Sequence, residues 1–116
     1  MGPSMTEDFF ITIINHVASE IHQNALEHGW WDTERNDGEM IALMHSELSE
    51  ALEAIRHGNP PDDKCPQFNG ATVEFADVII RILDTCYQRG WPVAEAIIAK
   101  HEMNKGRAHK HGGKLF

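Results

Sequence analysis

The sequence predicts an all-α fold, and three observations support this prediction. Apolar residues recur at helical spacing over most of the 116 residues. No stretch shows the two-residue alternation of a half-buried strand. Glycines and prolines divide the chain into segments of helical length. We therefore expect a bundle of four to five helices in one domain over residues 5–116, and we interpret residues 1–4 as a cloning remnant.

The first half of the chain predicts two helices. Residues 6–28 place their apolar side chains on one side, and Gly29 is positioned to end this first helix. A loop over residues 30–36 follows. The second helix is expected over residues 37–58, because Asp37 is a good N-capping residue and the sequence Asn-Pro-Pro comes directly after.

The second half predicts two further helices. Residues 59–69 are polar and contain prolines, which indicates a loop. The third helix is expected over residues 71–89, ended by Gly90. Pro92 is suited to the first turn of a fourth helix over residues 93–105.

Charge is distributed unevenly along the chain. The formal net charge is −8, but residues 1–99 carry 5 basic and 17 acidic side chains, which gives −12. Residues 100–116 carry 5 basic side chains against Glu102 alone, which gives +4. An acidic body of this kind argues against a protein that binds nucleic acid polymers.

The cysteine content and the hydropathy indicate the compartment. Cys65 and Cys86 are too few for a disulfide framework and lack the spacing of a zinc site. No apolar run reaches the roughly 20 residues that span a bilayer, and no signal peptide is recognisable. We therefore expect a cytoplasmic protein that does not interact with membranes.

The second helix places carboxylates on its apolar side. Its most apolar sector, which we expect in the core, holds Ile41, Met44, Leu48, Leu52 and Ile55. Glu47 falls within the apolar arc beside this sector, Glu50 lies at its edge, and Glu53 lies on the polar side. A carboxylate in an apolar sector needs a positive partner. Because no Lys or Arg lies one turn from Glu47, that partner should come from elsewhere.

The third helix repeats this arrangement. Apolar residues cover more than half of its circumference, so we expect it to be nearly surrounded. Its single polar stripe places Glu74 beside Asp77, with the same i, i+3 spacing that joins Glu47 to Glu50. Two such pairs on consecutive helices can face each other across a bundle.

Four oxygen ligands favour Mg²⁺, with Mn²⁺ as a substitute, over zinc. The simpler interpretation is that acidic i, i+3 pairs are ordinary solvated helix surface. A di-iron site is the other metal interpretation. It requires Glu-x-x-His motifs, and neither Glu47 nor Glu74 is followed by histidine three residues later.

Two further groups of residues are candidates for ligand binding. Lys100, Asn104 and Arg107 share one helical face if the fourth helix continues far enough, and such a face suits a polyphosphate. The alternative is a helix C-terminus stabilised by positive charge. Trp30 and Trp31 lie in the first loop, where each either closes the end of the bundle or stacks on a flat ligand.

Together these features resemble the all-α nucleoside triphosphate pyrophosphohydrolases, the MazG-like superfamily that also includes the dimeric dUTPases. The resemblance covers nearly the whole chain from Met5. It is carried by an E-x-x-E pair, Glu47-Leu48-Ser49-Glu50, and an E-x-x-D pair, Glu74-Phe75-Ala76-Asp77. The stretch EMIALMHSELSEALEAIRHG and the tail KHEMNKGRAHKHGGKLF resemble the MazG-like branch in particular. Its K-x-x-x-N-x-x-R pattern falls on Lys100, Asn104 and Arg107, whereas Ser46 stands where many members carry a glutamate.

This resemblance implies a MazG-like bundle, completed by assembly into a homodimer or homotetramer. It implies hydrolysis of a nucleoside triphosphate to the monophosphate and pyrophosphate, which suits a role in controlling the nucleotide pool. Mg²⁺ would be held by Glu47, Glu50, Glu74 and Asp77, with Glu47 or Glu50 as a potential base. Lys100, Asn104 and Arg107 would hold the phosphates, and Trp30 or Trp31 would stack on the base.

Two other functions remain open at this point. A noncatalytic helical oligomer could use the acidic residues to bind a divalent ion or a basic partner. A dUTPase-like preference for uracil nucleotides is the alternative within the family. The phosphate-tail pattern favours the MazG-like chemistry.

Overall fold

The computed structural model describes residues 4–107, and within them it is all-α. Its four helices are α1 (Met5–Glu27), α2 (Asp37–Arg56), α3 (Gly70–Arg89) and α4 (Val93–Lys105). The predicted all-α class and all four helices are therefore confirmed, with ends that differ from the expected ones by at most two residues. In this part of the chain the extended backbone pairs only at an isolated bridge, between Pro61 and Asn69. None of the described helices is long and apolar enough to cross a membrane.

Local sequence sets the helix ends. Ser4, which was expected to lie outside the domain, caps α1 in a reciprocal pair of hydrogen bonds with Glu7. The cap of α2 is Asn36 rather than Asp37, since the Asn36 side chain accepts a hydrogen bond from the Glu39 N–H. Gly90 ends α3 in the left-handed conformation, with φ of 72°.

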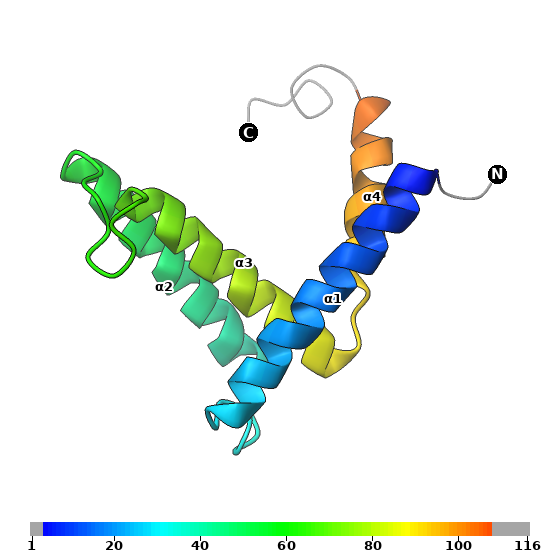
Figure 1. Cartoon of the computed structure of the whole chain (residues 1–116), viewed down its shortest axis with the longest axis horizontal. Coiled ribbons are helices and arrows are strands. Elements are labelled where there is room, and N and C mark those ends of the chain that lie inside the picture. Colours follow the sequence, from blue (N-terminus) through cyan, green and yellow to red (C-terminus); the bar gives the residue numbers. More distant parts are fainter. Residues whose placement is uncertain (1–3, 108–116) are drawn as a thin grey trace.

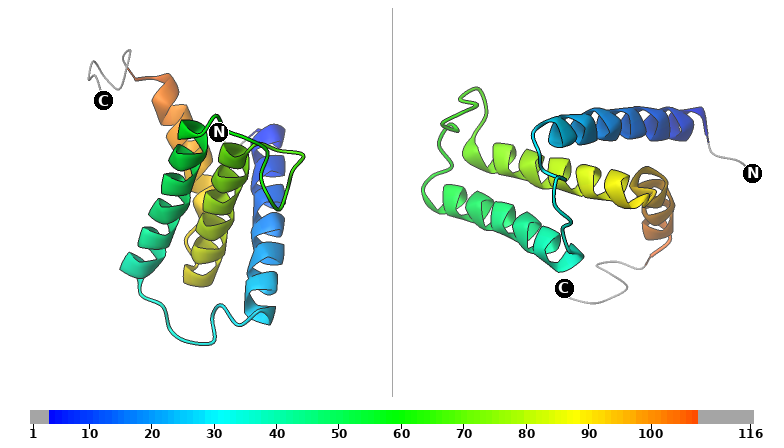
Figure 2. Two further views of the ribbon diagram at one scale, coloured as in Figure 1. Left: turned by 90° about the vertical axis from the view of Figure 1, so that its left-hand side faces the viewer. Right: turned by 90° about the horizontal axis from the view of Figure 1, so that it is seen from below.

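The helices form an open arrangement rather than a closed bundle. Figure 1 shows α2 and α3 side by side and antiparallel, with α1 crossing the C-terminal half of α3 and α4 beside α1. Figure 2 shows the same order from two further directions, with α3 between α2 and α1. The radius of gyration is 16.7 Å, whereas a compact domain of about 100 residues has about 13 Å.

The buried core of the single chain is correspondingly small. It consists of a few side chains, most of them alanines: Ala18, Met40, Ala51, Ala71, Leu83 and Ala94. The α2 sector that we expected in the core is wrong for one chain, because Ile41, Leu48, Leu52 and Ile55 are 42–53% exposed. The expectation that the third helix is nearly surrounded is wrong in the same way, since Phe75 and Ile79 are about half exposed.

The difference has a geometric cause. The side of α2 that faces α3 is the neighbouring arc, where Met40 and Ala51 are buried and Glu47 is partly buried. Small side chains on this arc let the two helices approach closely, and Ala54 comes within 3.1 Å of where a β-carbon on Gly70 would lie. Larger apolar side chains of both helices are left 42–56% exposed, among them Leu48, Leu52, Phe75 and Ile79. Exposed apolar surface of this size is typical of a protein interface.

Candidate metal centre and the adjoining cavity

Three carboxylates converge where α2 packs against α3. Glu47 and Glu50 come from successive turns of α2, and Glu74 comes from the first half of α3. Each offers one oxygen, and the three oxygens lie within 4.8 Å of one another. The structure therefore brings together three of the four carboxylates that the sequence singled out. We call Glu47, Glu50 and Glu74 the glutamate cluster.

Glu74 is the electrostatically unusual member of this cluster. Its Oε2 is buried and accepts no hydrogen bond from the described residues. Burial raises the pKa of Glu74 from 4.5 to about 8, and the nearby carboxyl groups of Glu47 and Glu50 add to the rise. A proton on Glu74 would lessen the repulsion among the three carboxylates. A divalent cation would perform the same task better, because it can contact all three oxygens at once.

Asp77, the fourth predicted ligand, lies one turn further along α3. Burial raises its pKa, the charge of Glu47 raises it further, and Arg81 lowers it. It is not one of the three residues whose oxygens converge. It instead lines the adjoining cavity together with Glu47. The oxygen-only donor set of these four residues fits Mg²⁺ or Mn²⁺.

Arg81 of α3 is the positive partner of Glu47. Its Nε and Nη2 lie 3.0 and 2.9 Å from the same Glu47 oxygen, Oε1, so both nitrogens address one atom. The Glu47 side chain is only 12% exposed. The prediction that its partner comes from elsewhere in the fold is therefore confirmed. Arg81 follows Asp77 by four residues on the polar stripe of α3, which is the signal that could have identified it.

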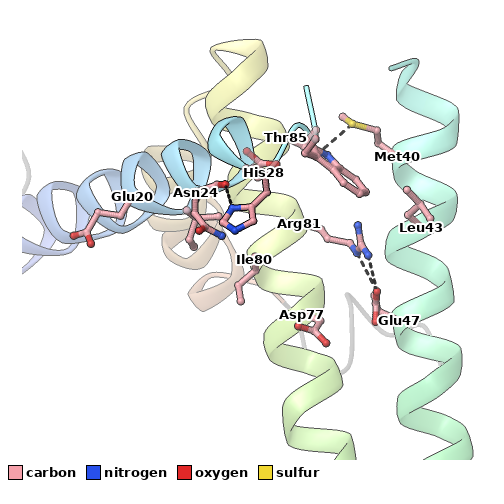
Figure 3. Close-up of a pocket in the computed structure, with 14 residues that line it drawn as sticks. Glu20, Asn24, His28, Met40, Leu43, Glu47, Asp77, Ile80, Arg81 and Thr85 are labelled. Atoms are coloured by element: carbon pink, nitrogen blue, oxygen red, sulfur yellow. Dashed lines mark hydrogen bonds and ion pairs between the residues drawn. The ribbon is translucent and has the colours of Figure 1, made fainter. Parts of the chain in front are cut away.

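A cavity of about 580 Å³ opens between α1, the following loop, α2 and α3. Figure 3 shows Arg81, Asp77 and Ile80 projecting from α3 toward it, with Glu47 and Leu43 on α2, Asn24 on α1 and His28 directly after α1. Such a volume is in the range of small-molecule sites. Among its lining residues, Arg81 is the one arginine or lysine, beside the four carboxylates Glu20, Glu47, Asp77 and Asp84.

A buried polar network borders this cavity, and the sequence analysis did not identify it. His22 Nδ1 lies 2.7 Å from Asp84 Oδ1, and both side chains are nearly buried. Trp31 Nε1 donates to both Asp84 oxygens at 3.1 Å. Asp84 follows Asp77 by two helical turns on the polar stripe of α3, but its partners come from α1 and the loop. No spacing within one helix could have shown that pairing.

The two tryptophans occupy different environments. Trp30 lines the cavity, and the Arg35 guanidinium carbon stacks 3.7 Å from its ring centroid. Trp31 is held by its hydrogen bonds to Asp84 and lies against His22, with ring centroids 6.1 Å apart. Arg35 therefore already stacks on Trp30, and a role for either tryptophan in base stacking stays a prediction.

The predicted phosphate-binding residues lie away from the glutamate cluster in the same chain. Lys100 and Asn104 are exposed on α4, and Arg107 follows the end of that helix. α4 packs on α1, and none of these three residues lines the cavity. Residues 108–116, the rest of the basic end, lie outside the described residues. Ser46 is exposed, and its hydroxyl donates to the Leu43 carbonyl oxygen at 2.7 Å.

Comparison of the chain with models of protein families, with curated proteins and with solved structures found no match.

Proposed function

We propose that this protein is a Mg²⁺-dependent nucleoside triphosphate pyrophosphohydrolase of the MazG-like kind. The observation that carries the proposal is the convergence of Glu47, Glu50 and Glu74 with the Glu74 Oε2 buried and unpaired. This is a donor set in need of a cation, and it adjoins a cavity of about 580 Å³ through Glu47. A nucleotide with its phosphates toward Glu47 and Asp77 would use both features. Mn²⁺ can replace Mg²⁺ with the same oxygen ligands.

The proposed chemistry assigns each carboxylate a task. Glu47, Glu50, Glu74 and Asp77 would hold the cation, which would neutralise charge on the phosphates and activate a water molecule. Glu47 or Glu50 would accept the proton of that water, because both belong to the cluster. Attack at the α-phosphorus then releases pyrophosphate and the monophosphate.

We also propose a homodimer or homotetramer as the working form. Apolar side chains of α2 and α3, such as Leu52, Phe75 and Ile79, are about half exposed in the single chain. The single chain buries few large apolar side chains, so covering this surface would supply stability that it lacks. Lys100, Asn104 and Arg107 are proposed to bind the phosphate chain.

A pyrophosphate-release assay tests the activity. Standard, deoxy and modified nucleoside triphosphates, with dUTP among them, are offered with Mg²⁺ and again with excess EDTA. We expect release only with the metal, and the ranking of substrates shows whether uracil is preferred. Release that persists in EDTA would overturn the metal mechanism. Stabilisation of the fold by Mg²⁺ without turnover of any nucleotide would instead favour the noncatalytic oligomer.

A matched pair of variants on α2 makes the assay specific. Glu50→Gln removes a member of the cluster, whereas Glu53→Gln changes an exposed glutamate one turn further on that pairs with Arg56 and His57. We expect a loss of about 100-fold or more in turnover for Glu50→Gln and activity close to that of the unchanged protein for Glu53→Gln. Equal activity of the two variants would count against the assignment.

A further inference from the structure

Arg81 lies between the Glu47 carboxylate and the cavity. In the structure it pairs with Glu47 through Nε and Nη2, while Nη1 bonds to no acceptor within residues 4–107. The Arg81 side chain keeps partial exposure, and it lines the cavity. Its guanidinium carbon lies 5.0 Å from the Trp30 ring centroid. Arg81 therefore stands at the boundary between the glutamate cluster and the cavity.

The charges of the cavity single out this residue. Four lining carboxylates would repel a triphosphate, and Arg81 is the one arginine or lysine among the lining residues that the structure describes. Lys100 and Asn104 do not approach the cavity within the same chain. A guanidinium can address two phosphate oxygens at once, which suits it to hold a phosphate chain in one orientation.

The position of Arg81 also sets it against a cation at Glu47. A cation and a guanidinium compete for the same Glu47 oxygen and repel each other. When the cation takes Glu47, Arg81 loses its partner, and a phosphate oxygen in the cavity is the anion that can replace it. The binding of metal and the binding of nucleotide would then support each other.

We propose that Arg81 is a substrate-binding residue that exchanges partners, pairing with Glu47 in the empty site and with a phosphate of the nucleotide when the metal is bound. This inference rests on the proposed function and adds to it a residue that the motif resemblance does not assign. In the metal-free protein Arg81 neutralises the partly buried Glu47 carboxylate, and it is released from this pair only when the metal binds. Metal binding at Glu47 therefore frees Arg81 to bind a phosphate of the nucleotide.

The test separates metal binding from nucleotide binding. Free Mn²⁺ is measured by electron paramagnetic resonance in the absence of nucleotide, for the unchanged protein, Arg81→Gln and Arg81→Lys. A nonhydrolysable α,β-methylene nucleoside triphosphate is then titrated calorimetrically at saturating Mg²⁺. For Arg81→Gln we expect Mn²⁺ to bind about tenfold more tightly and the nucleotide analogue about tenfold more weakly. Arg81→Lys should retain the charge without the fork and fall between the two in both measurements.

Arg89→Gln is the matched control. Arg89 is also an α3 arginine near a tryptophan, 5.9 Å from the Trp31 centroid, but it bonds to Asp37 and to the Arg35 carbonyl. Its substitution should leave Mn²⁺ affinity unchanged, with circular dichroism confirming that all variants are folded.

Three results would overturn the exchange. Weaker or unchanged Mn²⁺ binding in Arg81→Gln would show that Arg81 does not compete with the metal. Unchanged affinity for the analogue would show that it does not hold phosphate. Absence of Mn²⁺ binding in every variant would remove the metal centre and the exchange with it. If both expected shifts are seen but no nucleotide is hydrolysed, the exchange stands and the proposed activity fails.

Discussion

His22 and Asp84 form a nearly buried pair that joins α1 to α3, with 2.7 Å between Nδ1 and Oδ1. Trp31 donates to the same carboxylate and adds the loop before α2 to the network. The His22 ring also lies 4.9 Å from that of Tyr87, centroid to centroid. These contacts fix the wall of the cavity that lies opposite α2. The orientation of α1, and hence the shape of the cavity, depends on them.

Removing one member of this pair should destabilise the fold. His22→Ala removes a hydrogen-bonding partner from the buried Asp84 carboxylate. We therefore expect the free energy of unfolding to fall by about 1–3 kcal/mol. Urea denaturation followed by circular dichroism measures the change. His16→Ala is the control, because His16 pairs with Glu20 on an exposed face of α1, and its effect should stay below about 0.5 kcal/mol. Equal effects of the two variants would contradict the structural role of His22.

Glu74 should make the stability of the metal-free protein depend on pH. Its pKa is raised from 4.5 to about 8 in the folded chain, so the folded state holds a proton that the unfolded state releases. In EDTA the free energy of unfolding should therefore be highest at low pH and fall as the pH rises from about 5 to about 8. The raised pKa of Asp77 adds to the fall in the same direction.

Glu74→Gln isolates this contribution. Glutamine keeps a hydrogen-bond donor near Glu47 and Glu50 without a proton to lose, so the variant should be more stable than the unchanged protein at pH 8. Its urea midpoints should also vary less between pH 5 and about 8. Identical pH profiles of the two proteins would show that Glu74 does not carry the proton.

Metal binding should release that proton. Calorimetric titration with Mg²⁺ near pH 7, in buffers that differ in ionisation enthalpy, should show about one proton released per bound ion. The apparent affinity for Mg²⁺ should rise with pH up to about 8, because the proton on Glu74 competes with the ion. A binding enthalpy that is the same in all buffers would argue against displacement of a proton.

The exposed apolar surface predicts self-association. Light scattering after gel filtration should give a mass at least twice the 13.1 kDa of the chain. Ile79→Asp places a charge at a half-exposed apolar position of α3 that does not line the cavity, and we expect it to shift the protein toward monomer. Thr12→Asp, an exposed change on α1, should have no such effect. A monomer of 13.1 kDa for the unchanged protein would contradict the proposed assembly.

Assembly also bears on the cations of α4. Figure 1 shows α4 beside α1 and away from α2, so on the proposed function Lys100 and Asn104 would reach the phosphates bound by another subunit. Glu50→Gln and Lys100→Ala should each lose activity alone. Mixed and reassociated in equal amounts as dimers, they should recover about a quarter of the normal activity, because half of the dimers then contain one intact site. No recovery on mixing would assign Lys100 a different role.

Local signals were sufficient to predict the helices. Gly29 follows α1 and Gly90 ends α3, both with positive φ. A glycine at a helix end can be recognised from its position in the sequence alone. The i, i+3 carboxylate pairs were readable for the same reason, since they depend only on the pitch of one helix. The convergence of Glu47, Glu50 and Glu74 followed once α2 and α3 packed as antiparallel neighbours.

Local sequence signals could not predict the contacts between helices. A helical wheel ranks Ile41 and Leu52 as the most buried side of α2, but the close packing of Ala51 and Ala54 turns the adjacent arc toward α3. The pairing of Arg81 with Glu47, and of His22 with Asp84, likewise depends on the relative position of two helices along their axes.

The most direct test of the central claim is the identity of the products. Deoxynucleoside triphosphates are incubated with the protein and Mg²⁺, and the mixture is followed by ³¹P nuclear magnetic resonance, with Glu50→Gln and an EDTA sample alongside. The account predicts monophosphate and pyrophosphate in equal amounts with the unchanged protein, and intact triphosphate in the other two samples. Formation of diphosphate and inorganic phosphate, or the same products with Glu50→Gln, would contradict it.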